Sequence, residues 1–255
     1  APGVRRGVVT VAAGSDEASV EIARAAAGAL QRVELRPAEP SGAGVVEIAD
    51  SPALLALAAW GAASAGELAA VLDASVGEVR DAVARAAGAV ATDADGRLRF
   101  VDEASARALL ERAGGRRIET LERVAPAFAA RFPQAHARAA RLFELADQPL
   151  RAAYYAWRAA RSLLRASQLE RAHDAVELGR SALARAPAGQ VRALLGALLD
   201  VARAQLLRWS GDLAGSAAAA RAALASLPAG SAEWCESLGE RATAAGKTND
   251  ASELL

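Results

Sequence analysis

Two segments contain residues that could hold the phosphates of a nucleotide. Residues 8–15 are a hydrophobic run that ends in Gly14 and Ser15, as a strand does when it enters a phosphate-binding loop. A working loop also needs a second glycine and a lysine, and neither is present. The tripeptide at 246–248 is Gly-Lys-Thr, but Arg241 stands where the first glycine is required, and a helix rather than a strand precedes it. We expect a helix C-terminal turn there and no nucleotide at either place.

Metal-ion chemistry has little support in the residue types. Residues 45–50 (VVEIAD) could be a strand whose terminal acids hold magnesium, but without a phosphate-binding loop we interpret the acids as a strand end or a helix cap. Whether 45–48 is a strand or the start of a helix stays open. The two histidines, His136 and His173, are far apart, and the chain has no HExxH or CxxC spacing. We therefore expect no metal and no cofactor.

Nucleophilic chemistry is not indicated either. The single cysteine, Cys235, follows Trp234, and we expect it to be a small buried residue rather than a nucleophile. Acidic residues occupy positions typical of helix surfaces. We predict that the chain has no active site and is not itself an enzyme.

The most suggestive binding surface is a stripe of arginines on one predicted helix, residues 149–165. Four arginines fall within an arc of about 80° at 100° per residue: Arg151, Arg158, Arg161 and Arg165. Tyr154 and Trp157 lie beside them. Arginines next to aromatic side chains suit an acidic peptide or a partner protein. We take these six residues as the candidate partner-binding site.

A commoner arrangement accounts for the same stripe. In it, Tyr154 and Trp157 belong to the core and the arginines form a solvated rim. Trp209 and Trp234 have the same ambiguity, and we expect them to lie in the core of helical hairpins.

Composition limits the classes of protein that fit. The 255 residues are 53% hydrophobic, much of it alanine, which favours helices and their close packing. Thirty basic and thirty acidic residues give no net charge, which argues against nucleic-acid binding as the main task. One cysteine allows no intrachain disulfide and indicates a reducing compartment. With no apolar run long enough to span a bilayer and no signal peptide, we expect a cytoplasmic location. The absence of methionine suggests a piece of a longer protein.

Residues 1–51 read as a small α/β fragment. Residues 6–12 and 31–36 have β-rich composition, the latter stopped by Pro37, and residues 15–30 have the cap and periodicity of a helix between them. The order strand–helix–strand predicts that the two strands are parallel.

Residues 52–102 predict a winged helix-turn-helix. Helices are expected at 54–60, 66–72 and 75–87, the last with a capping box between Ser75 and Glu78. Strands are expected at 89–92 and 97–101, joined by a turn at 93–96. Such domains often bind DNA, and Arg80 and Arg85 on the third helix would be the contacts. Nearby acidic residues balance both arginines, so we regard DNA binding as an alternative and as unlikely.

Residues 103–255 contain no strand pattern and predict helical repeats. We expect helices at the following ranges: 103–113, 117–132, 136–146, 149–165, 169–185, 190–209, 213–226 and 231–245. A break at Gly114-Gly115 separates the first two. Leu169 and Leu213 begin similar helices with small residues at helical spacing, which is typical of tetratricopeptide-like hairpins with degenerate repeats.

The order of these elements resembles the middle and C-terminal part of STAND-type signalling ATPases, which in bacteria are often fused to kinases or transcription activators. Residues 33–37 (VELRP) are similar to the strand that ends the ATPase core in that family. Residues 99–110 (RFVDEASARALL) resemble the junction after its winged helix, with Asp102 where the family usually has histidine. Individually these motifs are short, and the order of elements is the stronger part of the resemblance.

The resemblance implies a regulatory or sensor module that binds a protein or peptide in the groove of its repeats. Ligand binding there would shift the packing on the winged helix and so act on an attached ATPase or kinase. Two alternatives remain: a winged-helix transcription regulator, and an inactive enzyme-derived scaffold that forms homo-oligomers.

Overall fold

The computed structural model describes residues 10–11, 36–37 and 51–248. The chain divides into two compact units, residues 1–47 and residues 48–255, which are treated separately below. The described residues form eleven helices and two small sheets, which confirms the prediction of a mainly helical chain. None of the helices in the described part is long and apolar enough to cross a membrane.

In the first unit, the described residues are two short strands. β1 (Thr10–Val11) and β2 (Arg36–Pro37) pair in parallel, with Thr10 opposite Arg36. The predicted parallel pairing is thus confirmed for these residues, although Pro37 lies inside the strand that we expected it to stop. The expected helix at 15–30 and the segment 45–48 lie outside the described residues.

The second unit begins with three helices and a hairpin. α2 (Pro52–Trp60), α3 (Ala65–Leu72) and α4 (Val76–Arg85) are followed by β4 (Val90–Thr92) and β5 (Leu98–Phe100). An additional strand, β3 (Ala62–Ala63), lies between α2 and α3 and pairs antiparallel with β5. The sheet order is therefore β3-β5-β4.

Local side-chain hydrogen bonds explain why these elements begin where they do. Ser75 and Glu78 form the predicted capping box, and Ser64 and Glu67 form a second one at the start of α3. In the hairpin turn, Asp93 Oδ1 accepts hydrogen bonds from the backbone N–H groups of Asp95 and Arg97, at 3.0 and 2.8 Å. In both caps and in the turn, the bonded residues are no more than four positions apart in the sequence.

The remaining helices follow one another through short loops. They are α5 (Glu103–Arg112), α6 (Gly114–Arg131), α7 (His136–Leu145), α8 (Pro149–Arg165), α9 (Leu169–Arg185), α10 (Gln190–Ser210), α11 (Leu213–Leu224) and α12 (Ala232–Thr248). The break expected at Gly114-Gly115 is displaced. Gly114 adopts a positive φ of 51° and begins α6, and Ala113 alone separates α5 from α6.

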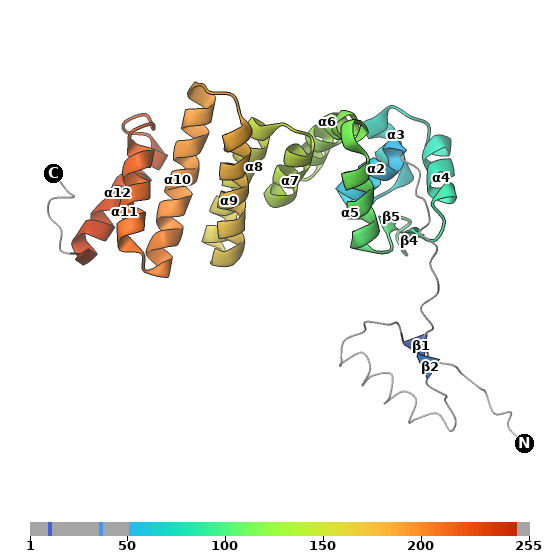
Figure 1. Ribbon diagram of the computed structural model, residues 1–255, viewed down its shortest axis with the longest axis horizontal. Coiled ribbons are helices and arrows are strands. Elements are labelled where there is room, and N and C mark those ends of the chain that lie inside the picture. The colour runs from blue at the N-terminus through green and yellow to red at the C-terminus, as the bar shows by residue number, and fades with distance from the viewer. Residues whose placement is uncertain (1–9, 12–35, 38–50, 249–255) are drawn as a thin grey trace, which may run out of the picture. The chain divides into compact units, whose positions relative to one another are not determined.

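From α7 to α12 the helices stand side by side in series, as Figure 1 shows. Each packs against the next, and the short loops between them make consecutive helices run in opposite directions. α8 also packs against α10, and α10 against α12. These three helices therefore form one layer, which we call the even layer, and α7, α9 and α11 belong to the other.

One connected core joins the first helices of this unit to the repeats. Its buried residues run from α2 through α10, and both α5 and α6 pack against α2. The core is therefore continuous across residues 102 and 103, where we predicted a domain boundary. That boundary stays a prediction.

Small residues allow the helices of the repeats to approach closely. On α8 every buried residue is an alanine, and on α9 Gly179 faces α8 and α10. A Cβ at Gly179 would lie 2.8 Å from Leu199 Cδ2 and 3.1 Å from Ala156 Cβ. The three helices thus meet at a distance that only glycine permits without rearrangement.

An arginine from α7 ties the repeats to the end of α2. Arg138 Nη2 donates to the carbonyl oxygen of Ala59 at 3.2 Å, and its guanidinium lies 5.9 Å from the centroid of Phe128. The last carbonyls of a helix lack partners within the helix, and a cation there is favourable for its dipole. Trp60 packs edge-on against Phe128 beside this contact, with ring centroids 5.7 Å apart.

Candidate functional site

The candidate surface is built on α8, whose sequence divides its two faces by size. Pro149 occupies the first turn, where its missing N–H costs nothing. The buried face consists of the alanines Ala152, Ala153, Ala156, Ala159 and Ala160. Tyr154 and three of the arginines, Arg151, Arg158 and Arg165, are exposed outside this buried face.

Tyr154 and Trp157 differ in their burial. Tyr154 is 37% exposed, whereas Trp157 is partly buried and packs against the main core. Their ring centroids are 5.9 Å apart, and Tyr155 stands edge-on to Tyr154 at 5.2 Å. Trp157 therefore combines a core contact with partial exposure, while Tyr154 is an exposed aromatic side chain held in place by its neighbours.

Three of the four arginines are exposed and spaced seven residues apart. Arg158 Nη1 donates to the Tyr154 hydroxyl oxygen at 2.8 Å, and its guanidinium lies 5.8 Å from the Tyr154 ring. Arg151 donates to Gln148 Oε1 at 3.1 Å and lies 5.7 Å from the Phe143 ring. Arg165, at the end of α8, is exposed. These arginines flank Tyr154 with positive charge.

Arg161 is engaged within the chain. Its Nη1 and Nη2 atoms pair with Glu233 Oε1 and Glu236 Oε1 of α12, each at 2.9 Å, while the guanidinium lies over the Trp157 ring. α8 and α12 are thus joined across α10, and the charge of Arg161 is balanced by two carboxylates. Its role as a partner contact stays a prediction, but a partner would find it already paired.

α10 adds two exposed aliphatic residues that sequence reasoning did not select. Val191 is 58% and Leu194 39% exposed. Both lie on the same face of α10 as Leu198, which packs against the main core as Trp157 does. Because α8 and α10 contact each other, Tyr154, Val191 and Leu194 are exposed on two adjacent helices of the even layer. The spacing of 191, 194 and 198 could have indicated this face.

The burial of Trp234, Trp209 and Cys235 agrees with our predictions in one case and differs in two. Trp234 packs against a small core of α10 and α11 residues, which confirms that it belongs to a hairpin core. Trp209 is 61% exposed at the end of α10, with the Arg208 guanidinium 4.9 Å from its ring, so the prediction that it is core was wrong. Cys235 is exposed on α12, so the prediction that it is buried was also wrong.

His136 is buried at the start of α7, beside the candidate surface. Its ring lies 6.3 Å from that of Tyr155, and its Nδ1 atom has no hydrogen-bond partner among the residues that the structure describes. Burial, and then the positive charge of Arg158, lower the pKa of His136 below its ordinary value. Burial and the nearby positive charge thus both disfavour the protonated imidazole.

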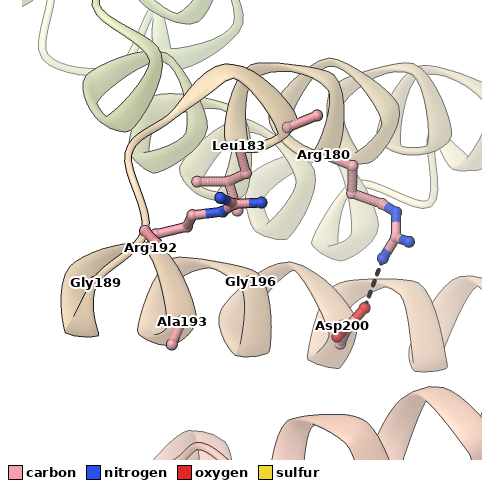
Figure 2. A pocket seen from close by; sticks show the side chains of 9 residues that line it. Arg180, Leu183, Gly189, Arg192, Ala193, Gly196 and Asp200 are labelled. Atoms are coloured by element: carbon pink, nitrogen blue, oxygen red, sulfur yellow. Dashed lines mark hydrogen bonds and ion pairs between the residues drawn. The ribbon is translucent and has the colours of Figure 1, made fainter.

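A separate hollow of about 450 Å³ lies between α9 and α10 (Figure 2). Arg180 points across it to Asp200, and the Arg180 Nη1 to Asp200 Oδ1 distance is 2.8 Å. Burial raises the pKa of the Asp200 carboxyl, and the nearby Arg180 acts against that rise. Arg192 donates to the Ala186 carbonyl oxygen at 3.1 Å. Both arginines of this hollow are thus engaged within the chain.

The features that DNA binding would need are sparse around α4. Arg80 and Arg85 are exposed there, but Arg97 of the hairpin donates to the Ala62 carbonyl oxygen and pairs with Glu67 at 3.5 Å. Residues 52–102 contain seven carboxylates and four arginines. The net negative charge of this segment opposes binding along the phosphate backbone of DNA.

Among residues 51–248 no three histidine, cysteine, aspartate or glutamate side chains gather in a way that could hold a metal ion. His136 and His173 lie on different helices, α7 and α9. Comparisons with protein-family models, with curated proteins and with solved structures found no match.

Proposed function

We propose that this chain is a non-catalytic protein-interaction module that binds an acidic peptide or protein segment on the even layer of its helices. The observation that carries the proposal is the exposure of Tyr154, Val191 and Leu194 on two adjacent helices, flanked by Arg151, Arg158 and Arg165. Aromatic and aliphatic anchors bordered by arginine are the composition of protein-binding hot spots.

The finer description of the fold belongs to the same proposal. We interpret residues 52–102 as a winged-helix-like domain, an interpretation supported by the order α2-β3-α3-α4-β4-β5 and the sheet order β3-β5-β4. We interpret the repeats as tetratricopeptide-like, supported by helices that pack in series and by alanine and glycine at their contacts. Both features agree with the resemblance to STAND-type ATPases.

In that setting the chain is a cytoplasmic regulatory module of a bacterial signalling ATPase or kinase. A partner that binds α8 and α10 would bias the packing of α7, which contacts α8 and carries Arg138 to the end of α2. A chain of packed elements thus connects the binding face to the first helices of the unit. Coupling requires that the partner favour one of two packings over the other.

A peptide-display selection against the purified chain tests the binding face. Library peptides are selected in about 0.3 M salt, which screens weak surface electrostatics. We expect the selected peptides to combine acidic residues with aromatic or aliphatic ones. Each is then titrated against the double variant Tyr154→Ala/Leu194→Ala, and we expect a loss of affinity of roughly tenfold or more, the effect of removing hot-spot side chains.

Val101→Ala is the matched control, because Val101 is also an exposed aliphatic residue but lies after the hairpin, away from α8 and α10. Its affinity for the same peptides should stay unchanged. A selection that enriches no peptide, or peptides that bind the double variant as tightly as the original chain, would refute this binding face.

A further inference from the structure

A groove of about 560 Å³ lies where the start of α2 meets α4 and α6. α6 lines it with Arg116, Thr120 and Arg123, which recur at a spacing that puts them on one side of the helix. α4 contributes Arg85 to the opposite wall. These elements are separate from the α8 and α10 surface, so the groove is independent of the proposed partner-binding face.

Three exposed arginines border this groove. Arg85, Arg116 and Arg123 are exposed, and within residues 51–248 no carboxylate pairs with any of them. Two glutamates also line the groove. Glu78 is committed to its capping box, where its Oε2 accepts from Ser75 N at 2.7 Å and from Ser75 Oγ at 2.9 Å. Glu119 is exposed, and an excess of positive charge remains.

Thr120 is the second observation that points to a ligand. Thr120 lines the groove and is only 6% exposed, and in the described part of the chain its hydroxyl has no hydrogen-bond partner. Threonine inside a helix ordinarily bonds to a carbonyl of the preceding turn. The hydroxyl is not fully enclosed, so it is available as a donor and acceptor to a ligand that enters the groove.

The start of α2 adds donors to the same place. Ser51 caps the helix by accepting from Leu54 N at 3.2 Å, and Pro52 occupies the first turn. The N–H of Ala53 has no acceptor within the helix, and the N-terminal end of a helix favours an anion. Ala53 lines the groove. Backbone and side chains therefore favour the same sign of charge.

We infer that this groove binds a small organic phosphate monoester. A phosphate monoester has close to two negative charges and three acceptor oxygens, which suits arginine guanidinium groups and a hydroxyl donor. The floor of the groove is apolar, formed by Leu55, Leu72, Val79 and Ala82, and would cover the organic part of the ligand. The volume is within the range of small-molecule sites.

Calorimetric titration of the full chain with three probes separates the parts of this inference. Phenyl phosphate offers the charge and an apolar ring, inorganic phosphate the charge alone, and benzyl alcohol the ring alone. We expect phenyl phosphate to bind at millimolar or lower concentration and more tightly than either of the others. Absence of phenyl phosphate binding, or equal affinity for inorganic phosphate, would overturn the inference.

Variants then locate the binding. Thr120→Val keeps the shape and removes the hydroxyl, and Arg123→Gln removes one guanidinium; each should weaken phenyl phosphate binding, the second by roughly tenfold. Glu119→Gln removes a competing negative charge and should tighten it. Arg99→Gln, at an exposed arginine of β5 outside the groove, is the matched control and should bind as the original chain does. Equal affinities for all four variants would place the ligand elsewhere and overturn the assignment.

Discussion

At the scale of single residues, His136 makes the stability of the fold depend on pH. Its pKa is lowered in the folded chain, by burial first and by Arg158 second, whereas in the unfolded chain it titrates near its ordinary value. The unfolded state therefore binds more protons as the pH falls. The contribution of His136 to stability is fully present above the ordinary histidine pKa and is lost as the pH falls through the lowered one.

We expect the variant His136→Gln to lose less stability than the original chain between pH 7.5 and pH 5.5. Urea unfolding at the two pH values measures the difference. The matched control is His173→Gln, because His173 is exposed on α9 and the chain has no other histidine. A pH dependence identical in all three proteins would contradict the role given to His136.

Residue type alone predicted the burial of some side chains and not of others. Trp234 lies in a core as expected, but Trp209, also on a helix of alanine and leucine, is exposed. Both have the hydrophobic surface of a core residue, and only the positions of the neighbouring helices decide which one is covered. Cys235, the next residue after Trp234 on α12, is exposed, although its residue type alone favoured burial.

At the scale of elements, the two capping boxes differ in what surrounds them. Glu67 of the first box also lies 3.5 Å from Arg97 and 4.0 Å from Arg131, and it is partly buried. Glu78 of the second is exposed and bonds to Ser75. In both glutamates hydrogen bonding to the cap residue lowers the pKa.

We therefore expect Ser64→Ala to lower the free energy of unfolding by about 1 kcal/mol or more, and Ser75→Ala by less. Chemical unfolding of the two variants in parallel provides the comparison, since both remove the same atom from the same kind of cap. A larger loss in Ser75→Ala would mean that the surroundings of Glu67 add nothing to its box.

The boundaries of α8 and α9 followed from local sequence. α8 begins at Pro149 and ends at Arg165, and α9 spans Leu169–Arg185, as predicted. β3 had no such mark, because Ala62 and Ala63 favour a strand only through their pairing with β5. We expected Gly114 to separate two helices. Instead it adopts a positive φ at the first position of α6, two residues after the end of α5.

At the scale of the whole second unit, Arg138 joins the repeats to the helices before them. The variant Arg138→Met keeps the apolar stem over Phe128 and removes the hydrogen bond to Ala59. We expect a loss of about 1–3 kcal/mol in the free energy of unfolding, because a buried carbonyl at the helix end loses a charged donor.

The matched control is Arg141→Met, one turn along α7, where the exposed arginine forms a surface ion pair with Glu144 at 3.1 Å. It should change stability by no more than about 0.5 kcal/mol. Since one core runs from α2 to α10, the unfolding of the Arg138 variant should remain a single transition. Two separate transitions would show that the parts before and after residue 102 unfold independently.

The candidate site could be predicted in part from the sequence. The arginine and aromatic stripe of α8 is a property of one helix, and its spacing is visible in the chain. That Val191 and Leu194 lie on a helix next to α8 could not be predicted, because it depends on α8 and α10 contacting each other with α9 in the other layer. The engagement of Arg161 is likewise a consequence of folding, since its partners are more than seventy residues away.

That engagement makes α12 an internal competitor for the binding face. Glu233 and Glu236 already offer Arg161 the carboxylates that an acidic partner would bring. A partner that reaches Arg161 must displace them, and its net affinity is the difference between the two sets of contacts. The same exchange would loosen α12 from α8, so partner binding and the packing of α12 against α8 oppose each other. Added salt would weaken both the ion pairs of Arg161 with α12 and those with an acidic partner.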